Sequence, residues 1–517
     1  MLKGVTKIEL TDINSGQVEV HEESNFITNA FSELCQPLFR LNDPFQSISS
    51  IYKPQLATED FVGGLLLFNK SLVESPTTLF APNDVRMVGH ASDITYSGSD
   101  LAMGSFNENQ SEFERNVKKF VWDFTSEQGN GSIASVCLTT KVGAFMGYGS
   151  DYPSEETSTM IKNAAVFNKS NVKLSLPSDG KAARYPVYIN FKDKYILSMS
   201  LSGIVSAKSL RFYKLYFWDD KADLFSTLPY NAFYQSSSIS EARGKVNSYI
   251  GDFYTKVDIV DVNIASVFGS GTSFGIGQDG KYLYLSALDI SISQSQSSAW
   301  APNTAKTFIK VDLETLTYST FQMTNTTGKY LIYRTDYTIY GYSFGVVNDE
   351  MFFSEWTSTY GTEKAQVYSI NMSDNTKVRE IKYADGTPAK SGSSEYKNDT
   401  APFMASIQGK AIFSKGIAQF MQVSGSNNSQ SICISPSDFI AQRMGVYPMS
   451  FGFLNGSGRF VPTDNPLFFG VVLNNEIDLT VVPFTNMLMT INNLGVPVTK
   501  TSAQTMRITY TLTKADE

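Results

Sequence analysis

A short pattern recurs in the middle of this chain and constrains its fold more than any other feature. In each copy, a polar turn leads into a strand of aliphatic and aromatic residues that ends in serine. The four copies are residues 193–198, 279–286, 349–354 and 409–414. Runs rich in Tyr, Phe and Ile that follow Asp- or Gly-containing turns are typical of β-strands. The pattern therefore predicts a domain built from repeated strands.

A second strand follows several of these copies. These strands are at 212–215, 308–315 and 367–374. A strand, a loop and another strand with a polar turn are typical of one blade of a β-propeller. The turns are spaced by 86, 70 and 60 residues, whereas common blade repeats take about 40–50 residues. The widest gap leaves room for an extra blade and the others imply long loops. A plain β-sandwich or an irregular β-domain is the alternative.

Strands are also predicted towards both ends of the chain. Residues 120–140 read as two strands around Gly129-Asn130-Gly131, because glycine allows positive φ in a tight turn. Residues 5–22 predict a hairpin with its turn at 12–16. A short helix is expected after Thr28 as N-cap. Its apolar face would carry Phe31, Leu34, Cys35 and Leu38.

Three segments carry a resemblance to a known family. They are the aromatic strand and Gly-Asn-Gly segment at 120–140, the opening at 7–30, and the closing strands at 489–501 and 506–513. The sequence of these segments resembles that of tail-associated structural proteins of phages and prophages of Gram-positive bacteria. The matches cover residues 1–150 and roughly the last thirty. The resemblance implies a virion protein and is less specific for which part of the virion.

The strand pattern also predicts how the domains are arranged. Residues 466–483 form a clean hairpin, and strands at 487–494 and 505–513 are expected to return to the N-terminal domain. We predict a mainly β protein in which both termini form a β-sandwich anchor with an inserted β-propeller-like domain. The expected divisions are a virion-anchoring domain with one short helix at 1–150, a linker at 151–185, a propeller-like candidate receptor-binding domain at 186–465, and C-terminal strands returning to the anchor at 466–517.

Composition excludes several classes of function. The 517 residues are 42% hydrophobic and only 18% charged, which suits large cores and uncharged polar surfaces. The net charge of −8 has no long basic cluster, so nucleic-acid binding lacks its usual electrostatic footprint. The three cysteines lie in apolar contexts and predict a protein made in a reducing compartment. We expect neither a signal peptide nor a membrane span, and therefore no insertion into a membrane.

The sequence offers few residues suited to catalysis, metal binding or cofactor binding. With only His21 and His90, we expect no catalytic triad and no metal site. The glycine-rich residues 269–277 lack the spacing and the following helix of a nucleotide site, so no cofactor is predicted. Glycosidase chemistry needs only two placed carboxylates. The acidic candidates for it are Asp219, Asp220, Asp258, Asp261, Glu314, Asp349, Glu350 and Glu355.

Aromatic residues in polar loops are the candidates for ligand binding. Trp300, Trp356 and Tyr360 lie between strands of the repeat, among Ser, Thr and Asn. Exposed indole and phenol faces stack on sugar rings. The alternative is that each indole packs under its own loop. Trp122 and Trp218 fall in predicted strands and are expected in a core or an interface.

Together these features predict a non-enzymatic phage tail protein, a fibre or receptor-binding protein that mediates adsorption to the host cell. Its expected partners are other copies of itself, other virion tail proteins, and a host-surface glycan or wall polymer. It would be made in the bacterial cytoplasm and reside in the virion tail. The alternatives are a purely structural tail or head-decoration component and a glycan-degrading tail spike.

Overall fold

In a computed structural model, the chain divides into a unit built from its two ends and a unit inserted between them. The structure describes residues 2–31, 62–82, 84–93, 95–96, 100–114, 117–140, 173–175, 185–200, 209–217, 254–264, 274–287, 299–332, 344–355, 365–383, 385–391, 403–407, 410–413, 431–434, 439–444, 458–473, 478–483 and 487–514. The terminal unit comprises Met1–Asn171, Leu224–Lys245 and Pro483–Glu517. The inserted unit comprises Val172–Asp223 and Val246–Val482.

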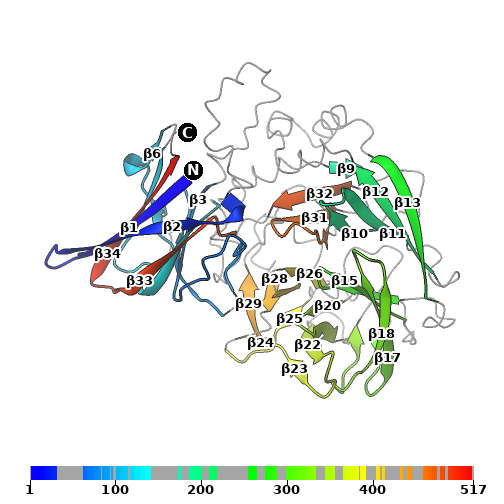
Figure 1. The fold of residues 1–517 in the computed structure, drawn as a ribbon. Helices are drawn as coiled ribbons and strands as arrows, with labels where there is room; N and C mark the ends of the chain where they lie inside the picture. The colour runs from blue at the N-terminus through cyan, green and yellow to red at the C-terminus, as the bar shows by residue number, and fades with distance from the viewer. Residues whose placement is uncertain are drawn as a thin grey trace, which may run out of the picture. The chain divides into compact units, whose positions relative to one another are not determined.

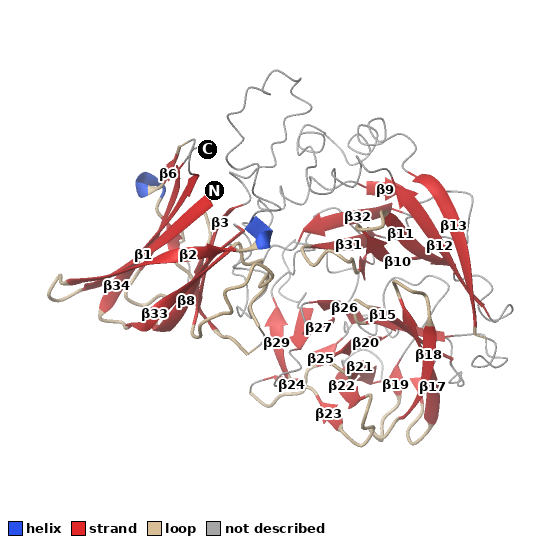
Figure 2. Ribbon diagram, viewed as in Figure 1, coloured by secondary structure: helices blue, strands red, loops and turns tan. Residues whose placement is uncertain are grey.

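Strands dominate both units (Figures 1 and 2). Helical pieces in the described ranges are short, such as the three-residue turn Glu108–Gln110. The prediction of a mainly β protein is therefore confirmed. No helix in this part of the chain is long and apolar enough to cross a membrane.

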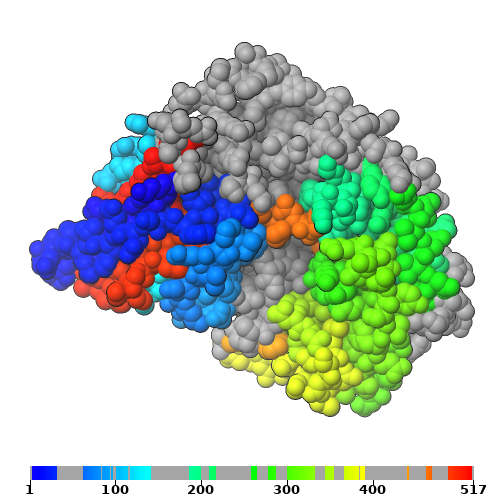
Figure 3. All heavy atoms as spheres, viewed as in Figure 1, coloured from blue at the N-terminus to red at the C-terminus, as the bar shows by residue number. Residues whose placement is uncertain are grey.

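The terminal unit is built on one ten-stranded hydrogen-bonded sheet among the described residues. In pairing order they are β4 (Met87–Ala91), β3 (Val62–Phe68), β8 (Gly131–Thr140), β33 (Thr490–Lys500), β2 (Val18–Ile27), β1 (Leu2–Asp12), β34 (Gln504–Lys514), β7 (Val117–Phe124) and β5 (Ser105–Phe106), with β6 (Glu112–Phe113) also on β7. The first and last of these strands along the chain, β1 and β34, lie side by side from Leu2↔Lys514 to Asp12↔Gln504. Figure 3 shows the N-terminal and C-terminal segments, blue and red, in contact on this unit's surface. Both termini therefore build the same unit, as predicted.

The predicted N-terminal hairpin is present as β1 and β2. Asp12 closes its turn, because Oδ1 accepts hydrogen bonds from the backbone N–H groups of Asn14 and Ser15 at 3.0 and 2.7 Å. Gly16 supplies the positive φ, at 70°. The predicted helix starts at residue 29, and its residues after 31 lie outside the described ranges. The hydroxyl of Thr28, the predicted N-cap, donates to the carbonyl oxygens of Leu488 and Met489.

The strands at 120–140 form as predicted, but they do not pair with each other. β7 pairs with β34, β5 and β6, whereas β8 pairs with β3 and β33. The Gly129-Asn130-Gly131 segment is therefore a corner between different parts of the sheet. Lys500 fixes this corner: its Nζ donates to Asn130 Oδ1 at 2.8 Å and to the Ser126 carbonyl at 3.2 Å.

The sheet of the terminal unit curls around a buried core. Trp122 is fully buried and stacks on Phe120 at a centroid distance of 5.7 Å, which confirms the core position expected for this indole. Buried Tyr510 of β34 donates its hydroxyl to Thr490 of β33, a strand elsewhere on the path. Because one pairing path joins all these strands, a sandwich of two separate layers stays a prediction.

Among the described residues, the strands of the inserted unit form four hydrogen-bonded sheets of 4, 11, 5 and 4 strands. Their antiparallel ladders divide into five successive groups of four strands, which we call blades. Blade 1 is β10 (Tyr185–Asn190), β11 (Tyr195–Ser200), β12 (Ser209–Phe217) and β13 (Tyr254–Asn263). Blade 2 is β14 (Phe274–Gln278), β15 (Tyr282–Ala287), β17 (Ala305–Asp312) and β18 (Tyr318–Thr324). Blade 3 is β20 (Phe344–Val347), β21 (Glu350–Glu355), β22 (Ala365–Asn371) and β23 (Val378–Glu380). Blade 4 is β26 (Phe403–Ile407), β27 (Lys410–Phe413), β28 (Ser431–Ile434) and β29 (Ile440–Met444). Blade 5 is β30 (Gly458–Val461), β31 (Phe468–Leu473), β32 (Asp478–Pro483) and β9 (Lys173–Ser175).

Contacts between first strands arrange these blades as in a propeller. β14 runs parallel to β20 through Gly277↔Phe344, β20 contacts β26, and β26 contacts β30. β10 contacts β30, and Ile189 bridges to Thr463. Blades 1 and 2 share an apolar core that includes Leu197 and Leu285. The ring closes when β9, the first strand of the unit, pairs with β32 near its end.

The repeat found in the sequence marks the second strand of successive blades: β11, β15, β21 and β27. Two predicted boundaries were wrong. The hairpin at 466–483 becomes β31 and β32 of blade 5, so the inserted unit continues to Val482. The predicted linker at 151–185 contains β9, whose backbone completes that blade. In the widest repeat gap, the described residues contain no extra blade, and residues 218–253 lie outside them.

Candidate binding surface of the inserted unit

The two ends of the inserted unit differ in the length of their connections. In an antiparallel blade, the turns from the first to the second strand and from the third to the fourth lie at one end, and all other connections lie at the opposite end. We call the first of these ends the short-turn end, and its connections include 191–194, 279–281, 313–317, 348–349 and 372–377. We call the opposite end the long-connection end, and the connections assigned to it by strand order include 201–208, 288–304, 356–364, 414–430 and 445–457. Two connections depart from this rule in length: 218–253 is long but belongs to the short-turn end, and 474–477 is short but belongs to the long-connection end.

The chain passes between the two units from the short-turn end of the inserted unit. It crosses four times: once before β9, twice between β12 and β13, and once after β32. As the fourth strand of its blade, β9 begins at the short-turn end, whereas β12 and β32 are third strands and end there. The strand ends next to these crossings therefore all lie at the short-turn end, and none lies at the long-connection end.

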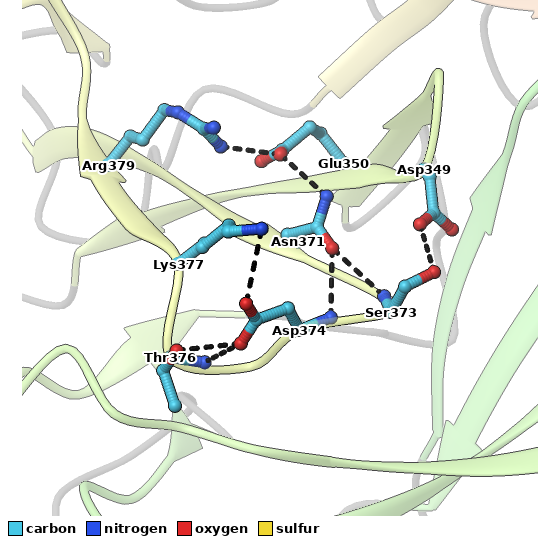
Figure 4. A network of polar contacts seen from close by, with 8 residues as sticks. All are labelled: Asp349, Glu350, Asn371, Ser373, Asp374, Thr376, Lys377 and Arg379. Carbon is cyan, nitrogen blue, oxygen red and sulfur yellow. Dashed lines mark hydrogen bonds and ion pairs between the residues drawn. The ribbon is translucent and has the colours of Figure 1, made fainter.

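A buried carboxylate organises the short-turn end of blade 3 (Figure 4). Glu350 is 3% exposed, and its Oε1 accepts hydrogen bonds from Asn371 Nδ2 at 3.0 Å and from the guanidinium of Arg379. Asn371 Oδ1 accepts from the backbone N–H groups of Ser373 and Asp374. A buried carboxylate is tolerated when a cation and donors surround it. Glu350 thus holds the β22–β23 turn in place.

The turns of blade 3 are also joined to each other. The Ser373 hydroxyl donates to Asp349, which lies in the β20–β21 turn with a φ of 65°. Asp374 Oδ1 accepts from the backbone N–H and the hydroxyl of Thr376, and its Oδ2 lies 3.2 Å from Lys377 Nζ. The hydrogen bonds from Thr376 and Lys377 lower the pKa of the Asp374 carboxyl.

Polar side chains connect neighbouring blades at the same end. Asp464, between β30 and β31, accepts hydrogen bonds from the backbone N–H groups of Phe191 and Lys192 in blade 1 at 2.7 and 3.0 Å. Tyr188 of blade 1 donates to Glu314 Oε1 of blade 2 at 3.2 Å. These contacts join blade 5 to blade 1 and blade 1 to blade 2.

Similar contacts continue around the ring. Tyr284 of blade 2 donates to Asp279 Oδ2 at 2.8 Å. Burial raises the pKa of Tyr284, and the nearby carboxylates of Asp279 and of Asp349 in blade 3 raise it further, so the phenol stays a donor. The guanidinium of Arg379 lies 4.0 Å from the ring centroid of Phe439, which precedes β29 in blade 4. Much of the polar chemistry described at the short-turn end is therefore used to hold blades together.

The structure contradicts one of the predicted glycan-stacking residues. Trp300 is fully buried, its Nε1 donates to the Thr304 carbonyl at 3.0 Å, and its ring packs against Phe308 and Phe353. The indole packs under its own loop, so neither face is available to a sugar. Trp356 and Tyr360, as well as Trp218, lie outside the described residues.

The two histidines take different positions. His21 lies in β2 with a partly exposed side chain, 2.8 Å from Glu19. His90 lies in β4, fully buried, with Nε2 at 3.2 Å from Asp100 Oδ2. Burial opposes ionisation of Asp100, but contacts with His90 leave the pKa of that carboxyl below its usual value. Among the described residues, no three His, Cys, Asp or Glu side chains gather to hold a metal ion.

The carboxylates considered for glycan cleavage are engaged in the fold wherever their contacts are described. Asp261 pairs with Arg211 at 2.7 Å, and Glu355 pairs with Lys329 at 2.9 Å. Glu314, Asp349 and Glu350 take part in the contacts above. Asp258 lies in β13, and Asp219 and Asp220 lie outside the described residues.

Comparisons with known proteins give little beyond weak structural likeness. No family model matches the chain, and no curated protein matches it. It is similar to the β-propeller domain of the Trilobed protease from Pyrococcus furiosus, with 7% identity, a TM-score of 0.23, and coverage of 74% of this chain and 95% of that one. It is also similar to YjhT, with 10% identity, a TM-score of 0.22, and coverage of 44% and 68%. The polysaccharide lyase Uly1 matches with 10% identity, a TM-score of 0.20, and coverage of 88% and 99%. The fold of this chain is defined by its strand pairing.

Proposed function

We propose that this protein is a structural component of a phage tail, a fibre or receptor-binding protein that mediates adsorption to the host cell surface. The terminal unit attaches it to other tail proteins, and the inserted unit presents its long-connection end to a host glycan or wall polymer. The observation that carries the proposal is the insertion itself: both termini build one sheet, and each strand of the inserted unit next to a crossing of the chain has its crossing end at the short-turn end.

The segments that resemble phage tail proteins support the attachment role. The Gly-Asn-Gly segment at 120–140 and the closing strand at 489–501 are far apart in sequence. They meet where Lys500 donates to Asn130. Their shared features therefore belong to one structural corner of the terminal unit, which fits a part that neighbouring tail proteins recognise.

The polar contacts support a division of roles within the inserted unit. Glu350, Asp464 and Tyr188 hold turns and blades together at the short-turn end, so a ligand there would compete with the fold. Trp356 and Tyr360 belong by sequence to the 356–364 connection and remain the aromatic candidates for stacking on sugar. Trp300 is no longer one of them.

The test is adsorption of the purified full-length protein to host cells and isolated cell walls, with pelleted protein and released sugar both measured. We expect saturable binding without sugar release, and competition with intact virions. Trp356→Ala and Tyr360→Ala should weaken binding at least about tenfold if each aromatic ring stacks on a sugar. Thr376→Ala, at the short-turn end, is the matched control and should bind normally.

Each contrary outcome identifies an alternative function. Release of sugar by the protein would make it a glycan-degrading tail spike. Absence of binding by the assembled, folded protein would make it a purely structural tail or head-decoration component.

A further inference from the structure

One edge of β2 is open in the terminal unit. β2 pairs with β1 from Thr11↔Val18 to Gly4↔Asn25, and with β33 only at Phe26 and Ile27. Over residues 18–24, no strand of the described chain pairs with its other edge. An open edge presents unpaired N–H and C=O groups to another strand.

The hairpin geometry shows which residues present those groups. The Asp12 N–H donates to the Gln17 carbonyl, and donor–acceptor pairs alternate along an antiparallel ladder. The backbone groups of the odd-numbered residues Glu19 and His21 therefore face β1. Those of Val18, Val20 and Glu22 point outwards.

The side chains on this edge are both apolar and charged. Val18 and Val20 are 50% and 51% exposed, so the outward edge carries two apolar side chains that contact solvent. On the opposite face, Glu19 Oε1 lies 2.8 Å from His21 Nε2, and both side chains reach solvent. A strand that pairs here must match valines on one face and a Glu–His pair on the other.

We propose that β2 is an assembly edge that pairs antiparallel with β2 of a second copy of this chain, with Val20 opposite Val20 across a two-fold axis. In this register, Glu19 lies opposite His21 of the second copy, and the two-fold axis makes this contact twice. The two adjacent registers that keep the outward backbone groups paired set Glu19 opposite Glu19 or opposite Glu23. Like charges directly opposite each other disfavour both.

This inference is independent of the proposed function, because its readout is the oligomeric state of the full-length protein. Sedimentation equilibrium should show an association by twos. Val20→Lys places two lysines at the axis and should weaken association about tenfold or more. Val496→Lys is the matched control, since Val496 is 75% exposed but lies on β33, and it should associate normally. Circular dichroism confirms that each variant is folded.

A charge exchange tests the register. Glu19→Lys sets lysine opposite histidine and should weaken association, whereas Glu19→Lys combined with His21→Glu sets lysine opposite glutamate and should recover it. A wild-type protein that does not associate by twos would overturn the proposal. Equal effects of Val20→Lys and Val496→Lys would do so too, as would failure of the charge exchange to recover association.

Discussion

The two units of this protein are closed in different ways. In the terminal unit, β1 and β34 pair at eleven positions, so the chain ends themselves form the centre of the sheet. In the inserted unit, the described residues of β9 and β32 pair at three positions, from Lys173↔Thr480 to Ser175↔Asp478. The terminal unit is therefore closed by a long backbone ladder, whereas the described closure of the inserted unit is short and side-chain contacts join its neighbouring blades. Under the proposed function, the terminal unit attaches the protein to the tail, and the inserted unit binds through the end opposite to the turns that hold its blades together.

The largest expected effects come from the two buried tryptophans, one in each unit. Trp122→Ala and Trp300→Ala should each lower the free energy of unfolding of their own unit by about 3–5 kcal/mol, because each creates a large cavity. Differential scanning calorimetry should show a different transition moving in each variant. If both substitutions shift the same single transition, the two units unfold together and the comparison fails.

A disulfide between β9 and β32 should test whether their short pairing limits the stability of the inserted unit. Leu174 and Leu479 are directly opposite each other in β9 and β32. Replacing both with Cys should stabilise the inserted unit by about 2–4 kcal/mol under oxidising conditions, because the bridge restricts the unfolded chain. Reduction should abolish the gain. The single variant Leu479→Cys is the control, and an equal gain in it would show that the closure is not the weak point.

A smaller loss is expected when one contact between blades is removed. Asp464→Ala should cost about 1.5–3 kcal/mol in the inserted unit, because it leaves the N–H groups of Phe191 and Lys192 without their charged acceptor. Asp385→Ala is the control, since Asp385 accepts hydrogen bonds from Thr387 within its own turn. Chemical unfolding measures both. Equal losses would contradict a special role for contacts between blades.

The smallest effect is a pH dependence of the terminal unit. Lys500 is 1% exposed, and burial lowers its pKa to about 8, against about 10.4 in an unfolded chain. Between these values the unfolded state binds more protons, so stability rises as pH increases above about 8. The melting temperature of the wild type relative to Lys500→Met should therefore increase from about pH 8 to about pH 9.5. A constant difference would show that Lys500 is not desolvated.

Local strand and turn patterns could be predicted from the sequence, whereas long-range partners could not. The repeat was visible because Asp and Gly turns precede aliphatic and aromatic strands, and these became the second strands of four blades. The partners of β7 and β8 were hidden, because nothing local shows that a Gly-Asn-Gly corner separates two strands instead of pairing them. The boundary at 466 was wrong because β31 and β32 read as a hairpin whichever unit they join.

The site residues show the same limit. Trp300 lies in a polar loop, and only the structure shows that Thr304, Phe308 and Phe353 enclose it. The role of Asp464 gave no sequence signal, because its partners are backbone amides of residues far away in the chain. Asp279 and Asp349 were visible as turn residues of the repeat, but their electrostatic effect on Tyr284 depends on how two blades pack.

The most direct test of the account is hydrogen–deuterium exchange on the full-length protein, with and without soluble fragments of host cell wall. The account predicts new protection in peptides covering the C-terminal ends of β11, β15 and β21, at the long-connection end. It predicts no change in the turns at 191–194, 279–281 and 348–349. Protection confined to those turns or to the terminal unit would contradict the assignment of recognition to the long-connection end.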